Sequence, residues 1–208
     1  MAFDIAAHLG AITREVRDLE IEGQLAKVIV ASRIYDTTPA DLWGALTQPE
    51  RLKRWFAPVT GDLKLGGRYH VEGNASGTIT ACVPQDRAEL TWEFGGYTSW
   101  VNFSIVPAEG GTMLVLEHIA HVSPHWTQYG AGAGGVGWEM GLLGLSEHLR
   151  RPADDVRSIA TGRRHPRIAE VWLGDVRVLS LSLMTAADDE LPAVNEPADE
   201  EAVDASEE

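Results

Sequence analysis

The sequence of 208 residues contains a single cysteine, Cys82, and has no long apolar run. A lone cysteine excludes an intramolecular disulfide and a cysteine-based zinc finger. No window approaches the roughly 18 uninterrupted apolar residues of a membrane-spanning helix, so no membrane span is predicted. The N-terminal residues lack a basic leader, and Asp4, His8, Arg14 and Glu15 interrupt their apolar positions, unlike in a signal peptide. We therefore expect a cytoplasmic protein.

Basic residues are few, and the acidic excess is uneven. The formal net charge is −14, with 17 basic and 31 acidic residues, and ten of the acidic ones lie in residues 185–208, which contain no basic residue. That segment also has two prolines and almost no large apolar side chains, a composition typical of a disordered acidic tail. Neither the tail nor the rest of the chain has the basic patch of a nucleic-acid-binding protein. No nucleic-acid partner is expected.

Motifs for common cofactors are also absent. The chain has no nucleophile elbow, P-loop or dinucleotide fingerprint. The run "GAGAGGVG" at 130–137 lacks the Lys-Ser/Thr of a P-loop, and it predicts a flexible connection. His118, His121 and His125 do not form a metal site by their spacing, because residues three apart on a strand point to opposite faces. No metal and no cofactor are predicted.

Secondary structure can be predicted from periodicity and turn residues. We expect a short helix over 3–9, then a hairpin whose second strand is 27–35. Thr38 as cap with Pro39 in the first turn predicts a helix, and Pro49 begins a second short helix. Five further strands, separated by Gly, Asn, Pro and Asp clusters, are expected at 69–72, 78–83, 89–94, 100–106 and 113–120. Alternation places one side chain in two on the inner face of this sheet, including Ile79, Ala81, Phe94 and His118.

A last helix is expected in "GVGWEMGLLGLSEHL". Its apolar stripe is Trp138, Leu142, Leu145 and Leu149. Three glycines also recur along this helix: Gly137, Gly141 and Gly144. Each destabilises a helix interior by about 1 kcal/mol relative to alanine. They indicate either close contact with the sheet, which we favour, or volume left free for a ligand. Glu139 is expected to be solvated or to favour the helix N-terminus, with a buried carboxylate as the alternative.

The order of elements predicts an α+β domain with one curved antiparallel sheet around a helix. "IYDTTPADLWGALTQPERLKRWFAP", "GDLKLGGRYHVEG", "LTWEF", "TMLVLEHIA" and "VGWEMGLLGLSEHL" resemble the SRPBCC, or START-like, superfamily, in the branch of activator of heat-shock protein 90 ATPase homologues. The resemblance implies a helix-grip fold, in which two short helices lie between the first strands and a cavity separates the sheet from the long C-terminal helix. Relatives use this cavity for hydrophobic or aromatic compounds, and some have built active sites in it.

On this basis we expect the chain to bind a hydrophobic or aromatic small molecule in the cavity. The residues expected to line it are Trp43, Trp55, Phe56, Tyr69, Trp92, Phe103, His118, Trp138 and Leu142. Trp55 and Phe56 would stand at its mouth, although burial in the core is the commoner fate of such side chains. His118 would contact the ligand or act as acid or base, with a core histidine bonded to a backbone carbonyl as the commoner alternative. No residue is assigned as catalytic.

Two other functions remain open: a cyclase- or hydrolase-type enzyme using the same cavity, and a chaperone-ATPase-activator-like interaction protein. The expected organisation is an N-terminal extension at 1–25, the START-like domain at 26–150, an arginine-rich extension at 151–184 and the acidic tail at 185–208. Seven arginines fall within 150–177. The segment that contains these arginines is either a solvated extension or a docking segment for a protein partner.

Overall fold

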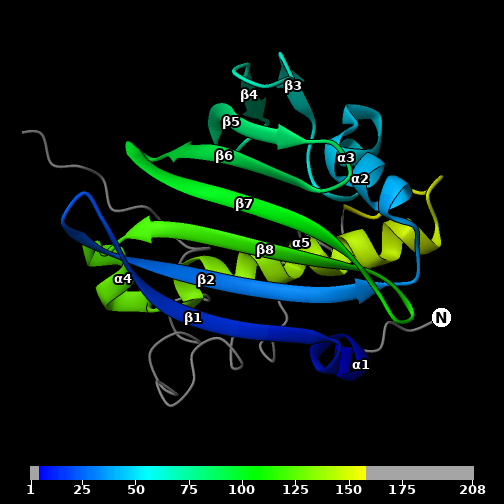
Figure 1. Cartoon of the computed structure of the whole chain (residues 1–208), viewed down its shortest axis with the longest axis horizontal. Helices are drawn as coiled ribbons and strands as arrows, with labels where there is room; N and C mark the ends of the chain where they lie inside the picture. Colours follow the sequence, from blue (N-terminus) through cyan, green and yellow to red (C-terminus); the bar gives the residue numbers. More distant parts are fainter. Residues whose placement is uncertain (1–4, 158–208) are drawn as a thin grey trace, which may run out of the picture.

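One antiparallel sheet of eight strands curves along a long helix in the computed structural model, which describes residues 5–157 (Figure 1). The strands are β1 (Ile12–Ile21), β2 (Gln24–Tyr35), β3 (Val59–Gly61), β4 (Arg68–Val71), β5 (Ser76–Val83), β6 (Arg87–Phe94), β7 (Tyr97–Ala108) and β8 (Gly111–His121). The helices are α1 (Ile5–Gly10), α2 (Pro39–Thr47), α3 (Pro49–Trp55), α4 (Pro124–Tyr129) and α5 (Gly132–Arg150). The sheet order is β1-β2-β8-β7-β6-β5-β4-β3. The predicted α+β helix-grip arrangement is confirmed.

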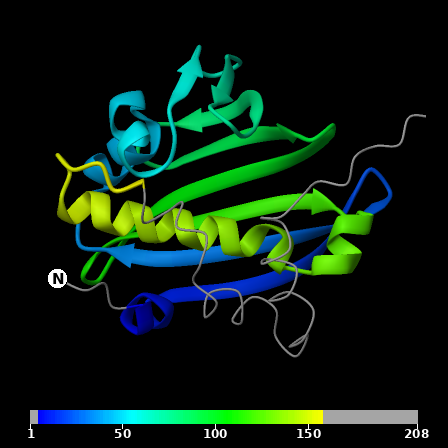
Figure 2. The ribbon, with the colours of Figure 1, turned by 180° about the vertical axis from the view of Figure 1, so that it is seen from behind.

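The layers explain where a cavity can form. Seen from behind, α5 runs across the face of the sheet, and α2 and α3 close one end of it (Figure 2). The core between the sheet and α5 contains Ile29, Ala31, Leu114, Leu143 and Leu145, all buried. The acidic tail and most of the arginine-rich extension lie outside the described residues. Within residues 5–157, no helix is long and apolar enough to cross a membrane.

The N-terminal hairpin forms as the sequence predicts. Glu22 and Gly23 both have positive φ, 52° and 76°, and join Ile21 to its partner Gln24. Two central residues with positive φ form the tight turn whose twist matches that of the flanking strands. β1 is therefore continuous with the sheet, at its edge.

The two short helices also form where their caps predict. Thr38 Oγ1 accepts a hydrogen bond from the Asp41 amide at 3.2 Å, and Pro39 opens α2. Pro49 opens α3, which ends at Trp55. Helix α3 is short and ends at Trp55, so it places Trp55 and Phe56 at the end of the sheet.

The structure corrects the expected connection at 130–137, because α5 already begins at Gly132. A glycine-rich helical start costs stability locally, but here it allows close packing on the sheet. A Cβ on Gly134 would lie 3.0 Å from Nδ1 of His118 and 3.3 Å from Ile29. Helix α4 and strand β3 were not predicted, and α4 is capped by Ser123, whose side chain accepts from the Trp126 amide.

A bulge changes which side chains of β5 face inward. The register of β5 against β6 shifts between Ile79 and Ala81, so that Cys82 lies opposite Ala88. Beyond a bulge the alternation of faces is reversed. The expectation that Ala81 lines the inner face is therefore wrong, and Cys82 takes that place. Phe94 is also misplaced by simple alternation, since it lies at the end of the β6–β7 hairpin and is 58% exposed.

Candidate functional site

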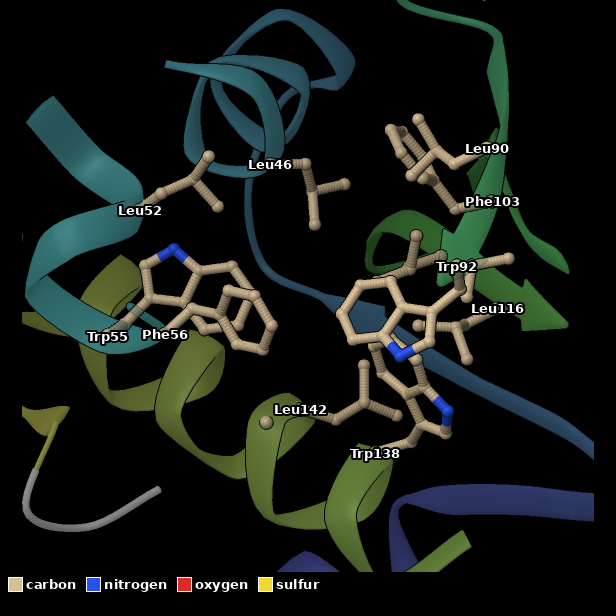
Figure 3. Close-up of a pocket in the computed structure, with 13 residues that line it drawn as sticks. Leu46, Leu52, Trp55, Phe56, Leu90, Trp92, Phe103, Leu116, Trp138 and Leu142 are labelled. Atoms are coloured by element: carbon tan, nitrogen blue, oxygen red, sulfur yellow. The ribbon is translucent and has the colours of Figure 1, made fainter. Parts of the chain in front are cut away.

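Two adjoining apolar pockets lie where α2 and α3 meet the sheet. The larger has a volume of about 310 Å³ and is lined from α2, α3 and strands β3 to β7. The smaller, of about 100 Å³, lies between α2, α3, the sheet and α5, and Figure 3 shows side chains that line it. Six side chains line both pockets: Leu46, Leu52, Phe56, Leu90, Trp92 and Phe103. The shared wall makes them two compartments of one cavity.

The aromatic pair after α3 forms one wall of the cavity. Trp55 is only 6% exposed, lines the smaller compartment and donates its indole N–H to the Ala45 carbonyl at 3.0 Å. Phe56 is half-buried, lines both compartments and lies 5.5 Å from Trp55 between ring centroids. Trp55 is thus a core residue and cavity wall at once, whereas Phe56 lies where the two compartments join.

Aromatic rings also cover the sheet side. Trp92 lies 6.4 Å from Tyr69 and 5.1 Å from Trp138, the second contact being edge-on. The Tyr69 hydroxyl donates to the Thr91 carbonyl at 2.6 Å, so its polar end is occupied by the protein. Trp43 lies 5.7 Å from Phe103, and both line the larger compartment. Rings held in this way offer flat apolar surfaces for stacking.

Helix α5 leaves part of the cavity open. Gly141 is buried and lines the smaller compartment, yet a Cβ built on it would meet no heavy atom within 4 Å. Gly137, one turn earlier, is exposed and equally open. The favoured interpretation of close contact with the sheet is therefore wrong at these two positions. At Gly141 the missing side chain adds volume to the cavity.

The cavity wall carries no formal charge. Within the described part of the chain, no Asp, Glu, Lys, Arg or His lines either compartment, and the polar side chains there are Thr47, Cys82, Tyr69 and the indoles. An uncompensated charge is costly to desolvate in such a site. The walls therefore favour uncharged apolar groups. No group of His, Cys, Asp and Glu suited to a metal ion occurs within residues 5–157.

The structure brings together eight of the nine predicted residues. Trp43 and Tyr69 line the larger compartment, Trp55, Trp138 and Leu142 the smaller, and Phe56, Trp92 and Phe103 both. His118 lines neither. The prediction missed the aliphatic wall, notably Leu46 and Leu52, although the helical spacing of these leucines marked them as inward-facing. Cys82 could not be found, because the bulge that turns it inward has no clear sequence signal.

His118 lies beside the cavity, edge-on to Trp138 with ring centroids 5.6 Å apart. Ser99 Oγ donates to the Trp92 carbonyl at 3.1 Å, so it accepts from His118 Nε2 at 3.0 Å. Burial lowers the pKa of His118 from 6.5 to about 4, which keeps the ring neutral. The expected carbonyl partner is thus replaced by a hydroxyl. His118 supports the strand that carries Trp92.

This buried histidine predicts a pH dependence of stability. The unfolded chain takes up a proton on His118 below pH 6.5, whereas the folded chain resists it until about pH 4. The contribution of His118 to stability is therefore complete above pH 6.5 and is lost as the pH falls to about 4, by about 3 kcal/mol. Urea unfolding across this window measures it. His118→Gln keeps a donor for Ser99 without titrating, so its profile should be flatter, and identical profiles would contradict the assignment.

Glu139 is buried on the opposite side of α5, which corrects the expectation of a solvated residue. Its side chain is 0% exposed and forms a bidentate ion pair with Arg14 of β1, whose Nε lies 2.7 Å from Oε2. Nε2 of His8 lies 3.9 Å from the same carboxylate. Next to them, Arg33 contacts His8 Nδ1 at 2.5 Å and donates to Ser146 Oγ at 3.0 Å. This polar cluster joins α1, β1 and β2 to α5, away from the cavity.

Comparison with known proteins identifies the family to which this fold is similar. Residues 36–150 match the family described as Activator of Hsp90 ATPase homolog 1-like protein. The human protein named Activator of 90 kDa heat shock protein ATPase homolog 1 is 28% identical over 95 residues, which are 43% of this chain and 28% of the human protein. The match thus spans 28% of that relative's length.

Solved structures extend the likeness to nearly the whole described fold. The crystal structure of CalU16 from Micromonospora echinospora has a TM-score of 0.64 at 32% identity, covering 78% of this chain and 96% of that one. Its solution NMR structure has a TM-score of 0.65 at 30% identity, covering 78% of this chain and 93% of that one. DynU16, a protein in the dynemicin biosynthetic locus, has a TM-score of 0.56 at 18% identity, covering 62% of this chain and 49% of that one, and shows the fold alone.

Proposed function

Because this chain belongs to the Activator of Hsp90 ATPase homolog 1-like family, of the SRPBCC type, we propose that it binds an uncharged hydrophobic or aromatic small molecule between the sheet and α5. The observation that carries this proposal is the two-compartment cavity with aromatic walls and no charged lining residue. Ligand pockets have this size range and this apolar character.

The energetics of packing support the proposal. Protein cores are close-packed, and voids larger than a water molecule are few. Apolar wall area that stays in contact with water forgoes about 25 cal/mol for each Å² that burial would remove from water. A ligand that covers the walls of both compartments gains this free energy. Gly141 lowers the stability of the longest helix and leaves part of the same volume open. Binding a ligand there offsets this cost.

The predicted residues take distinct roles in this proposal. Trp92 and Trp138 stack against a flat ring, and Leu142 fills the floor of the smaller compartment. Phe56 belongs to the wall that the two compartments share and would contact a ligand in either of them. The remaining predicted wall residues are Trp43, Trp55, Tyr69 and Phe103. His118 acts through Ser99 by holding the strand of Trp92, and does not itself touch the ligand.

The first test is the mass of the gently purified full chain under native and denaturing conditions. An additional mass that disappears on denaturation supports binding and identifies the ligand. The second test is titration with N-phenyl-1-naphthylamine, an uncharged aromatic fluorophore. We expect saturable fluorescence enhancement with quenching of tryptophan emission. The absence of both an additional mass and saturable binding would overturn the proposal.

Two alternatives follow from the family. A cyclase or hydrolase needs polar groups that converge on one substrate atom. The charge-free lining within residues 5–157 provides no such pair, so we rank binding above catalysis. Activation of a 90 kDa heat shock ATPase is favoured by the similarity to the human protein of that name, over 28% of its length. The ATPase rate of the chaperone with and without the full chain tests it, and an unchanged rate would exclude it.

A further inference from the structure

Strand β1 forms one edge of the sheet, and it is long for an edge strand. It has ten residues, and β2 is its neighbour in the sheet. A long open edge is a template for pairing with another strand, and natural proteins usually shorten or block it. Most of β1 is exposed, including Val16 at 45% and Leu19 at 40%.

The hairpin determines which backbone groups of β1 are available. Ile21 and Gln24 close a two-residue turn and therefore form a hydrogen-bonded pair. Because hydrogen-bonded pairs alternate along an antiparallel ladder, the odd-numbered residues of β1 bond to β2. The N–H and C=O groups of Arg14, Val16 and Asp18 then point outward at the edge. These are the groups that a further strand would use.

The charges on β1 are self-complementary in one antiparallel register. With Val16 opposite its own copy, Glu15 of each chain faces Arg17 of the other. Asp18 lies across from Arg14, whose guanidinium stays on Glu139 of its own chain. Glu15 and Arg17 are about half exposed, at 53% and 48% of their side-chain area. Opposite charges directly across a strand pair stabilise it, and like charges destabilise it.

Neighbouring registers do not have this match. A shift of the two-fold axis to Arg17 places two arginines face to face, and a shift to Glu15 places two glutamates face to face. Registers that place an odd-numbered residue opposite an even-numbered one are excluded, because opposed residues must lie on the same side of the sheet. The charge pattern therefore specifies both the partner and the register.

We propose that β1 pairs with β1 of a second copy of this chain across a two-fold axis at Val16, joining two sheets into one. This contact is independent of the larger compartment, which is lined from α2, α3 and strands β3 to β7. Strand β1 lies at the edge of the sheet opposite to β3 (Figure 1). Pairing of one strand per chain buries a small area, so the dimer is concentration-dependent.

Sedimentation equilibrium of the full chain tests the proposal. The average mass should rise from 22.6 kDa toward twice that value with increasing concentration. Val16→Lys places two ammonium groups at the axis and should weaken the dimer at least about tenfold. Leu25→Lys is the matched control, because Leu25 is also exposed, at 53%, but lies on β2, and it should leave dimerisation intact.

A charge exchange tests the register. Arg17→Glu places glutamates opposite one another and should weaken the dimer, and Glu15→Arg combined with Arg17→Glu should restore it. Unchanged binding of N-phenyl-1-naphthylamine by these variants would show that the fold and cavity are intact. A single-chain mass at all concentrations, or a dimer that survives Val16→Lys, overturns the proposal. A double variant as weak as Arg17→Glu overturns the register.

Discussion

Gly141→Leu is expected to abolish binding of N-phenyl-1-naphthylamine without destabilising the protein. The new side chain projects into the smaller compartment, where no heavy atom lies within 4 Å of the Cβ position. Replacing glycine within a helix also gains about 0.8–1 kcal/mol. We expect the affinity to fall by at least about a hundredfold, which corresponds to about 3 kcal/mol. Fluorescence titration and urea unfolding measure the two effects separately.

Gly137→Leu is the matched control for this experiment. Gly137 lies one turn earlier on α5 and has equally open surroundings, but it is exposed. This variant should gain the same helical stability and keep wild-type binding. Equal loss of binding in both variants would indicate a general change in α5. Full binding by a folded Gly141→Leu variant would show that the ligand does not occupy the smaller compartment.

Arg14→Met is expected to destabilise the protein by about 3–5 kcal/mol, because it removes the guanidinium that pairs in bidentate fashion with the buried Glu139 carboxylate. Its matched control is Arg17→Met on the same strand. Arg17 is 48% exposed and pairs with the exposed Glu15, so its loss should cost less than about 1 kcal/mol. Denaturant unfolding at neutral pH compares the two variants.

The double variant Arg14→Met with Glu139→Gln shows whether this cost comes from the unpaired charge. Removing both charges should recover part of the stability lost in Arg14→Met, because the buried side chain at position 139 is then neutral. This account would be contradicted if the double variant were less stable than Arg14→Met by as much as Glu139→Gln costs on its own. Comparable losses in Arg14→Met and Arg17→Met would show that burial of the Glu139 pair contributes little.

Local signals in the sequence predicted most elements of the fold, but not α4 or β3. Thr38 with Pro39 and the second proline at 49 begin α2 and α3 as expected, since caps depend on a few adjacent residues. Glu22-Gly23 turns the first hairpin for the same reason. The aromatic wall and Leu142 followed from alternation and helical spacing combined with the family resemblance, whereas Leu46 and Leu52 were missed. Eight of the nine predicted residues therefore line the cavity.

What the sequence by itself determined is thus the class of the fold, the order of its elements and the aromatic character of the cavity. Only the tertiary structure decided where the charges and the open volume lie. Glu139 meets Arg14 across 125 positions, and a bulge of one residue turns Cys82 inward. At Gly134 the helix touches His118, whereas at Gly141 it leaves space. Identical residues on one helix differ in this way because contacts between distant segments depend on how the sheet curves, which local propensity does not specify.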